Sequence, residues 1–98
     1  MSYQYAKNTV KLRIPAKIRD VVQDNNLKMS EVLENAMNAY IRGEMVLDNI
    51  GGAVVTTSAY CDESKVKPFE ALANEAGMSM NAAMSQALVY ELRRRGIL

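Results

Sequence analysis

Residues 9–15 read Thr-Val-Lys-Leu-Arg-Ile-Pro, a run in which polar and apolar side chains alternate. A period of two predicts a β-strand with one buried face, and the proline closes the run. The outer face would then present Thr9, Lys11 and Arg13 side by side. Five basic residues and no acidic one lie between positions 7 and 19. Long cationic donors in a row suit a nucleic-acid groove better than a protein core.

After this strand the apolar spacing becomes helical. Ile18, Val21 and Val22 predict a short helix over residues 16–24, which Asn25 and Asn26 interrupt. A longer helix follows, and Gly43 is its expected stop. Its apolar stripe consists of Met29, Val32, Leu33, Ala36, Met37, Tyr40 and Ile41.

The second half of the chain repeats this order. Residues 53–61 are rich in β-branched and small side chains and predict a strand. A short helix is expected to enter at residues 62–64 with Pro68 in its first turn, and Gly77 ends it. Ser79 is a good N-cap for the last, long helix, along which Met80 and Met84 lie on the apolar stripe. A shift of 51 residues superposes the two long helices, whereas a shift of about 47 aligns the strands, so the second half has a few extra residues in between.

One strand and two helices in under fifty residues cannot enclose a core, and a lone strand needs a partner. We therefore expect one compact domain in which the two strands pair as an antiparallel ribbon over four helices. The expected organisation is a flexible arm (1–8), a first unit (9–43), a linker (44–53) and a second unit (54–98). The inward residues of the second strand, Thr57, Ala59 and Cys61, are small. This leaves open an exchanged dimer in which two chains pair their first strands.

Composition excludes several classes of function. The chain has 98 residues, a net charge of +1, one cysteine and no histidine. The usual general base, a disulfide and a thiolate metal cluster are therefore missing, and we expect neither a cofactor, a metal site nor an enzyme, with the carboxylates on solvated helix faces. No segment resembles a signal peptide or a membrane span, so the sequence predicts a cytoplasmic protein without a membrane partner.

The order of strand, closing proline and two helices resembles the ribbon-helix-helix DNA-binding family (Arc/MetJ-like). Residues 27–30 through 40–43 resemble the turn and second helix of that family, and residues 75–81 resemble its inter-helix turn more closely. The resemblance implies a mainly α fold with a two-stranded antiparallel ribbon, arranged β-α-α-β-α-α. Because both copies lie in one chain, it implies a single-chain pseudo-dimer, similar to tandem regulators of phages and conjugative plasmids.

The resemblance also implies which residues meet DNA. The ribbon would enter the major groove, with base contacts from Thr9, Lys11, Arg13, Thr56, Ser58 and Tyr60. The N-termini of the two long helices would meet phosphates through Lys28, Met29, Ser30, Ser79, Met80 and Asn81. The simpler alternatives are that the strand residues only solvate an exposed edge, that Tyr60 packs on the ribbon, and that the helix termini only cap.

Three functions remain open on this reading. The first is a sequence-specific double-stranded DNA-binding protein, most simply a transcriptional repressor, which could self-associate on adjacent sites. A variant of it is an accessory protein that marks or bends DNA for a relaxosome. The third is a protein-binding inhibitor module on the same scaffold, with an unidentified partner. Arg93, Arg94 and Arg95 complement the C-terminus of the last helix, or else contact a phosphate or a protein.

Overall fold

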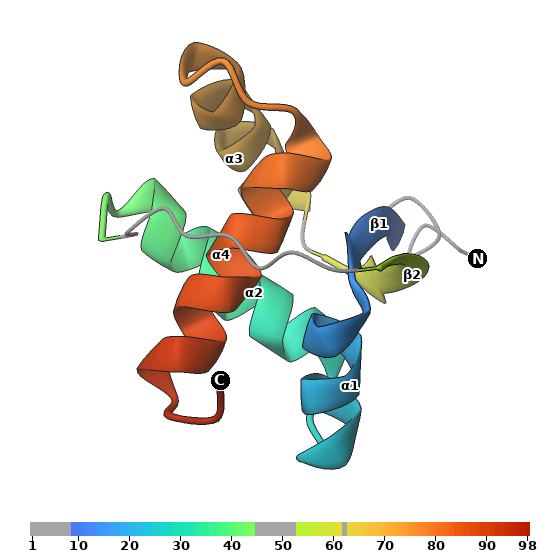
Figure 1. Ribbon diagram of the computed structural model, residues 1–98. Helices are drawn as coiled ribbons and strands as arrows, with labels where there is room; N and C mark the ends of the chain where they lie inside the picture. The colour runs from blue at the N-terminus through green and yellow to red at the C-terminus, as the bar shows by residue number, and fades with distance from the viewer. Residues whose placement is uncertain (1–8, 45–52, 62) are drawn as a thin grey trace, which may run out of the picture.

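The computed structural model describes residues 9–44, 53–61 and 63–98. The expected arm at 1–8, the linker residues 45–52, Asp62 and the side chain of Tyr60 lie outside the described part. The molecule is mainly helical, with four helices and one two-stranded antiparallel sheet in the order β-α-α-β-α-α (Figure 1). The elements are β1 (Thr9–Pro15), α1 (Ala16–Asp24), α2 (Met29–Ile41), β2 (Val54–Tyr60), α3 (Glu63–Glu75) and α4 (Met80–Arg94).

The two strands pair within the one chain. Their register runs from Thr9 opposite Tyr60 to Pro15 opposite Val54. Lys11 faces Ser58 next to the middle pair, Leu12 and Thr57, and a shift of 47 residues carries Lys11 onto Ser58. The offset that aligns the two strands in the sequence is therefore also the offset between these two facing residues.

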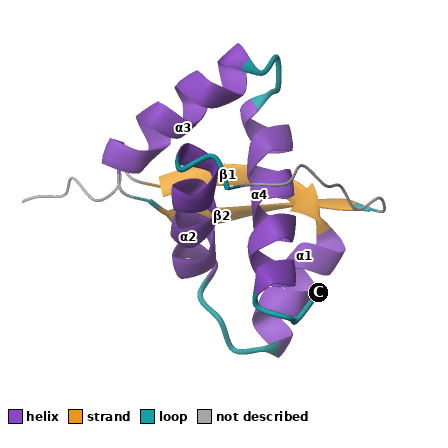
Figure 2. Ribbon diagram, turned by 90° about the vertical axis from the view of Figure 1, so that its left-hand side faces the viewer, coloured by secondary structure: helices purple, strands orange, loops and turns teal. Residues whose placement is uncertain are grey.

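The ribbon lies on one side of the molecule and the helices cover its inner face (Figure 2). Leu12 and Ile14 of β1 are fully buried beneath it, and Ala59 of β2 is buried beside them. Helix α4 packs against β1, and α2 packs against β2. Because each long helix supports one strand, the inward side chains of the ribbon join a single core.

The core also connects the two halves through their helices. Helix α2 contacts both α3 and α4. The rings of Tyr40 and Phe69 pack edge to face, with a centroid distance of 4.9 Å and an interplanar angle of 61°, a favourable arrangement for aromatic rings. The expectation that methionines fill the core is confirmed: Met37 and Met84 are fully buried, and Met29 and Met80 are partly buried against them.

All four helices end in the same way. The second residue after the end of each helix has a positive φ, Asn26 (56°) after α1 and Gly43 (76°) after α2, with Gly77 and Gly96 in the corresponding places after α3 and α4. The N–H group of the following residue then donates to the carbonyl five residues earlier, for example from Glu44 to Ala39 at 3.0 Å. This is the Schellman motif, which satisfies carbonyls that the helix itself leaves unpaired. The predicted stops at Asn25-Asn26, Gly43 and Gly77 are thus confirmed.

Two details of the predicted helices are wrong. Helix α3 has 13 residues against the 9 of α1, so the extra residues of the second half form additional helix. Pro68 consequently lies inside α3 and not in its first turn. Ile41 was expected on the buried stripe, but it is the last residue of α2 and is exposed. Its counterpart Leu92 is fully buried because α4 continues beyond it.

The expectation that every carboxylate is solvated is also wrong, because Glu91 is fully buried. The Nη2 atom of Arg94 lies 2.9 Å from both of its carboxylate oxygens, and the Nε of Arg95 lies 2.7 Å from Oε2. Arg95 also approaches Glu31 of α2 at 3.9 Å. Two of the three terminal arginines thus neutralise a buried anion, which a charge in a low-dielectric site requires.

Candidate nucleic-acid interface

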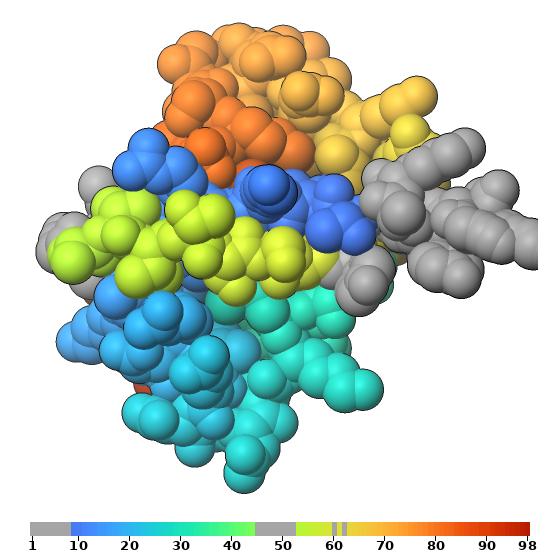
Figure 3. Space-filling model, turned by 90° about the vertical axis from the view of Figure 1, so that its right-hand side faces the viewer, coloured from blue at the N-terminus to red at the C-terminus, as the bar shows by residue number. Residues whose placement is uncertain are grey.

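The outer face of the ribbon is an open strip across one side of the molecule. Lys11 and Arg13 of β1 and Thr56 and Ser58 of β2 are all exposed on it, as is Thr9. In Figure 3 the ribbon crosses the view, with helical residues of the second half above it and helical residues of the first half below it. The structure therefore brings together five of the six residues predicted to contact bases, and for Tyr60 it gives the strand position alone.

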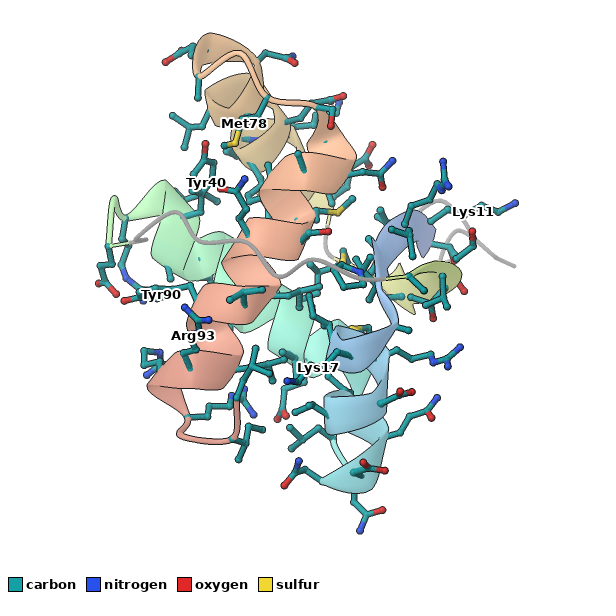
Figure 4. The ribbon with its side chains drawn as sticks, in the orientation of Figure 1. Lys11, Lys17, Tyr40, Met78, Tyr90 and Arg93 are labelled. Atoms are coloured by element: carbon teal, nitrogen blue, oxygen red, sulfur yellow. The ribbon has the colours of Figure 1, made fainter. Side chains whose placement is uncertain are left out.

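The strip carries two cations that no acidic side chain of the described residues neutralises. Among the described residues, neither Lys11 nor Arg13 takes part in an ion pair, whereas the nearby Arg19 is paired with Asp20 at 3.2 Å. Figure 4 shows Lys11 extending away from the body of the molecule. These two side chains are free to bind an external acceptor, and Arg13 can do so through two parallel N–H donors.

The backbone at Arg13 is held by α4. Its N–H donates to Oδ1 of Asn81 at 3.0 Å, and its carbonyl accepts from Oγ of Ser85 at 3.4 Å. Both groups therefore turn away from β2, which makes Arg13 and Thr56 a non-hydrogen-bonded pair of the antiparallel ladder. Lys11 and Ser58 follow two residues along and belong to the same class. Partners of this class lie closest, with Cα atoms about 4.5 Å apart.

The two long helices begin differently. Ser79 caps α4 by accepting a hydrogen bond from the N–H of Ala82 at 3.1 Å, as predicted. Lys28 occupies the same place before α2 and makes no side-chain cap, so it adds an exposed charge there instead. Ser79 and Asn81 are exposed at the start of α4, and Met80 is partly buried. Met29 and Ser30 are partly buried at the start of α2.

One residue of the outer face escaped the sequence reasoning. Val54 is half exposed, at 50%, and it is two residues before Thr56 on the same strand. Since side chains two apart on a strand share a face, Val54 extends the strip by one apolar position beyond Arg13 and Thr56. The alternation of side chains along β2 could have predicted this exposed position. A valine at the first position of a strand, however, is equally typical of a buried core residue.

The Cys61 thiol is buried next to the end of β2. Its burial, together with the charge of Glu34, raises the pKa of the thiol to about 11. The thiol is therefore protonated at neutral pH and is a poor nucleophile. Within the described ranges, no three His, Cys, Asp or Glu side chains are grouped so that they could hold a metal ion. None of the helices seen there combines the length and the apolarity needed to cross a bilayer.

Comparison of this chain with protein-family models, with curated proteins and with solved structures finds no match. The function of the protein is therefore inferred from the geometry of the ribbon and of the helices beside it.

Proposed function

We propose that this protein is a tandem ribbon-helix-helix protein that binds double-stranded DNA sequence-specifically, by inserting its ribbon into the major groove. The single observation that carries the proposal is the two-sidedness of the ribbon. Leu12 and Ile14 are fully buried on the helices, while Lys11 and Arg13, which alternate with them, are exposed and without ion pairs among the described residues.

The dimensions and chemistry of the major groove match such a ribbon. The groove is about 12 Å wide, admits a two-stranded ribbon, and displays a distinct donor and acceptor pattern for each base pair. Arg13 has the paired donors that fit O6 and N7 of guanine, and Lys11 reaches the same acceptors with one ammonium group. Thr56 and Ser58 supply short hydroxyl groups that donate or accept.

The helices beside the ribbon supply contacts that do not depend on sequence. The N-terminus of α4 offers unpaired N–H groups next to Ser79, and Lys28 brings a charge to the start of α2. Helix N-termini favour anions because of these N–H groups and the helix dipole. In the proposal these two ends meet phosphates on either side of the groove and orient the ribbon within it.

The two strands are chemically different, so the preferred site is not a palindrome. The described outer residues of β1 include both cations of the strip, and those of β2 are uncharged. A symmetric dimer would present identical halves to the two half-sites. Here β1 would supply most of the discrimination, and β2 would tolerate more sequences.

Selection from a randomised duplex library in low salt tests the proposal, because it requires one enriched sequence. Replacing Arg13 by alanine should then weaken binding to that sequence by about 1–3 kcal/mol and relax the preference at one base pair. Arg42→Ala is the matched control. It also removes one positive charge, but at the end of α2 far from the ribbon, where Arg42 pairs with Glu44 at 2.7 Å (Figure 1). An equal loss for both variants, or no duplex bound at all, refutes the proposal.

Repression by occlusion of a promoter is the simplest consequence of such binding, and we propose it as the biological role. A genome-wide footprint should place the sites over promoters. Footprints confined to a transfer origin would favour the relaxosome accessory role instead.

A further inference from the structure

We propose that Asn81 and Ser85 are positioning residues that fix Arg13 to helix α4, so that the selectivity of Arg13 depends on them. This inference rests on the proposed function. Its physical basis is an edge clamp, defined as the side chains of Asn81 and Ser85 with the backbone of Arg13. Asn81 accepts from the Arg13 N–H at 3.0 Å, and Ser85 donates to the Arg13 carbonyl at 3.4 Å.

The clamp fixes the position of the strand along the helix. Asn81 and Ser85 are four residues apart and therefore lie on one face of α4. Backbone groups of an antiparallel strand alternate between the partner strand and the outer edge. If β1 slipped by one residue along α4, the N–H group of the residue then next to Asn81 would point toward β2 and away from Asn81. A slip by two residues in one direction would bring Pro15, which has no N–H group to donate, and a slip by two in the other direction would place Lys11 on the clamp and displace Arg13.

Recognition by Arg13 needs such a fixed backbone. A two-stranded ribbon is marginally stable alone and twists readily. Bidentate binding of guanine, however, demands a defined direction of the guanidinium group. The clamp ties the backbone from which this side chain emerges to the helix whose N-terminus would meet a phosphate. It thereby sets the spacing between the base contact and the phosphate contact.

This changes the role expected for Asn81. Its side-chain oxygen is committed to β1, so only its amide nitrogen remains to donate to a phosphate. Helix α2 presents a different pair of side chains to β2. The shift of 51 residues places Ser30 and Glu34 at the positions equivalent to Asn81 and Ser85.

The test compares three variants on duplexes from the library selection described above. Each variant is measured on the enriched duplex and on the duplex altered at the base pair whose preference Arg13→Ala relaxes. Asn81→Ala should reduce the ratio of these two affinities at least fivefold, and it should have no further effect on the ratio in an Arg13→Ala background. Ser85→Ala should act in the same direction with a smaller change. Asn81→Asp keeps the acceptor, so the ratio should survive although the added negative charge weakens binding to every duplex.

Stability and positioning are separated by a control in α3. Ala71 is exposed in the interior of that helix, so Ala71→Gly destabilises the fold without touching the ribbon. The ratio should be unchanged in this variant. Amide exchange of Arg13 in the free protein should be slow in the wild type and in Asn81→Asp, and fast in Asn81→Ala. An unchanged ratio in Asn81→Ala would overturn the inference while leaving the proposed function intact, whereas failure to select any duplex would overturn the proposed function.

Discussion

The buried carboxylate of Glu91 offers the sharpest test of how the C-terminal end of α4 is stabilised. Replacing Glu91 by glutamine preserves the shape of the side chain but removes its charge and turns an N–H₂ group toward an arginine. The bond to Arg95 is short, at 2.7 Å, and the Arg95 side chain is only 23% exposed. A charge-assisted hydrogen bond of this kind contributes about 1.5–3 kcal/mol.

Arg94 contributes less than Arg95 to the free energy of unfolding, although it binds both carboxylate oxygens of Glu91. Its side chain is 55% exposed, so solvent screens the pair and its share is below about 1 kcal/mol. We therefore expect Glu91→Gln to lower the free energy of unfolding by about 2–3 kcal/mol and Arg94→Ala by less than about 1 kcal/mol. For a domain of this size each kcal/mol lowers Tm by about 4–8 °C.

Urea titration at pH 7 measures both variants on one scale, because the midpoint shifts while the slope stays constant if the native fold is kept. Repeating the titration in 1 M NaCl should reduce the effect of Arg94→Ala and leave most of the effect of Glu91→Gln, since salt screens exposed pairs more than buried ones. Equal losses for the two variants that both vanish in salt would contradict the buried position of Glu91.

Three further predictions concern other parts of the fold. Light scattering should give a monomer of 10.9 kDa, since β1 pairs with β2 of its own chain, and an obligate dimer would indicate exchanged strands. Asn26→Gly should raise the free energy of unfolding by about 0.5–1 kcal/mol because glycine adopts the positive φ there at lower cost. Asn25→Gly, the control at a negative φ of −99°, should lower it in the same urea titration. Raising the pH from about 9 to about 11 ionises the Cys61 thiol in the unfolded chain before it ionises in the fold, where its pKa is raised to about 11, so about 2 kcal/mol of the free energy of unfolding is lost over that range. Cys61→Ala should lack this part of the decline, and an equal decline in both proteins would mean that the thiol is solvated.

Much of the fold was predictable because its signals are local. The alternating run at 9–15 predicts β1 with its observed bounds, and the helical spacing after it predicts α1 over 16–24. The offset of 51 residues between the long helices matches their first residues, Met29 and Met80. Periodicity decides each of these features within a few residues, so no knowledge of the partner element is needed.

Features that depend on distant partners were not predictable. A glutamate followed by three arginines at the end of a helix reads as an exposed charge network, and only the packing of α4 against α2 buries Glu91. Asn81 resembles an ordinary residue of a helix N-terminus, and its bond to Arg13 spans 68 residues of sequence. The exposed positions of Lys11 and Arg13 followed from alternation, whereas their contacts with bases stay predictions.

The pair of Lys11 and Ser58 gives a physical reason for carrying both halves in one chain. These two residues form a close, non-hydrogen-bonded pair, and they are related by the same shift of 47 residues that aligns the strands. In a dimer of identical chains with this register, the residue at this position would face its own copy, so a lysine would face a lysine. Like charges placed directly opposite each other destabilise a ribbon. Joining the halves lets a small hydroxyl face the lysine, which keeps a cation on the outer strip without a second lysine opposite it to repel it.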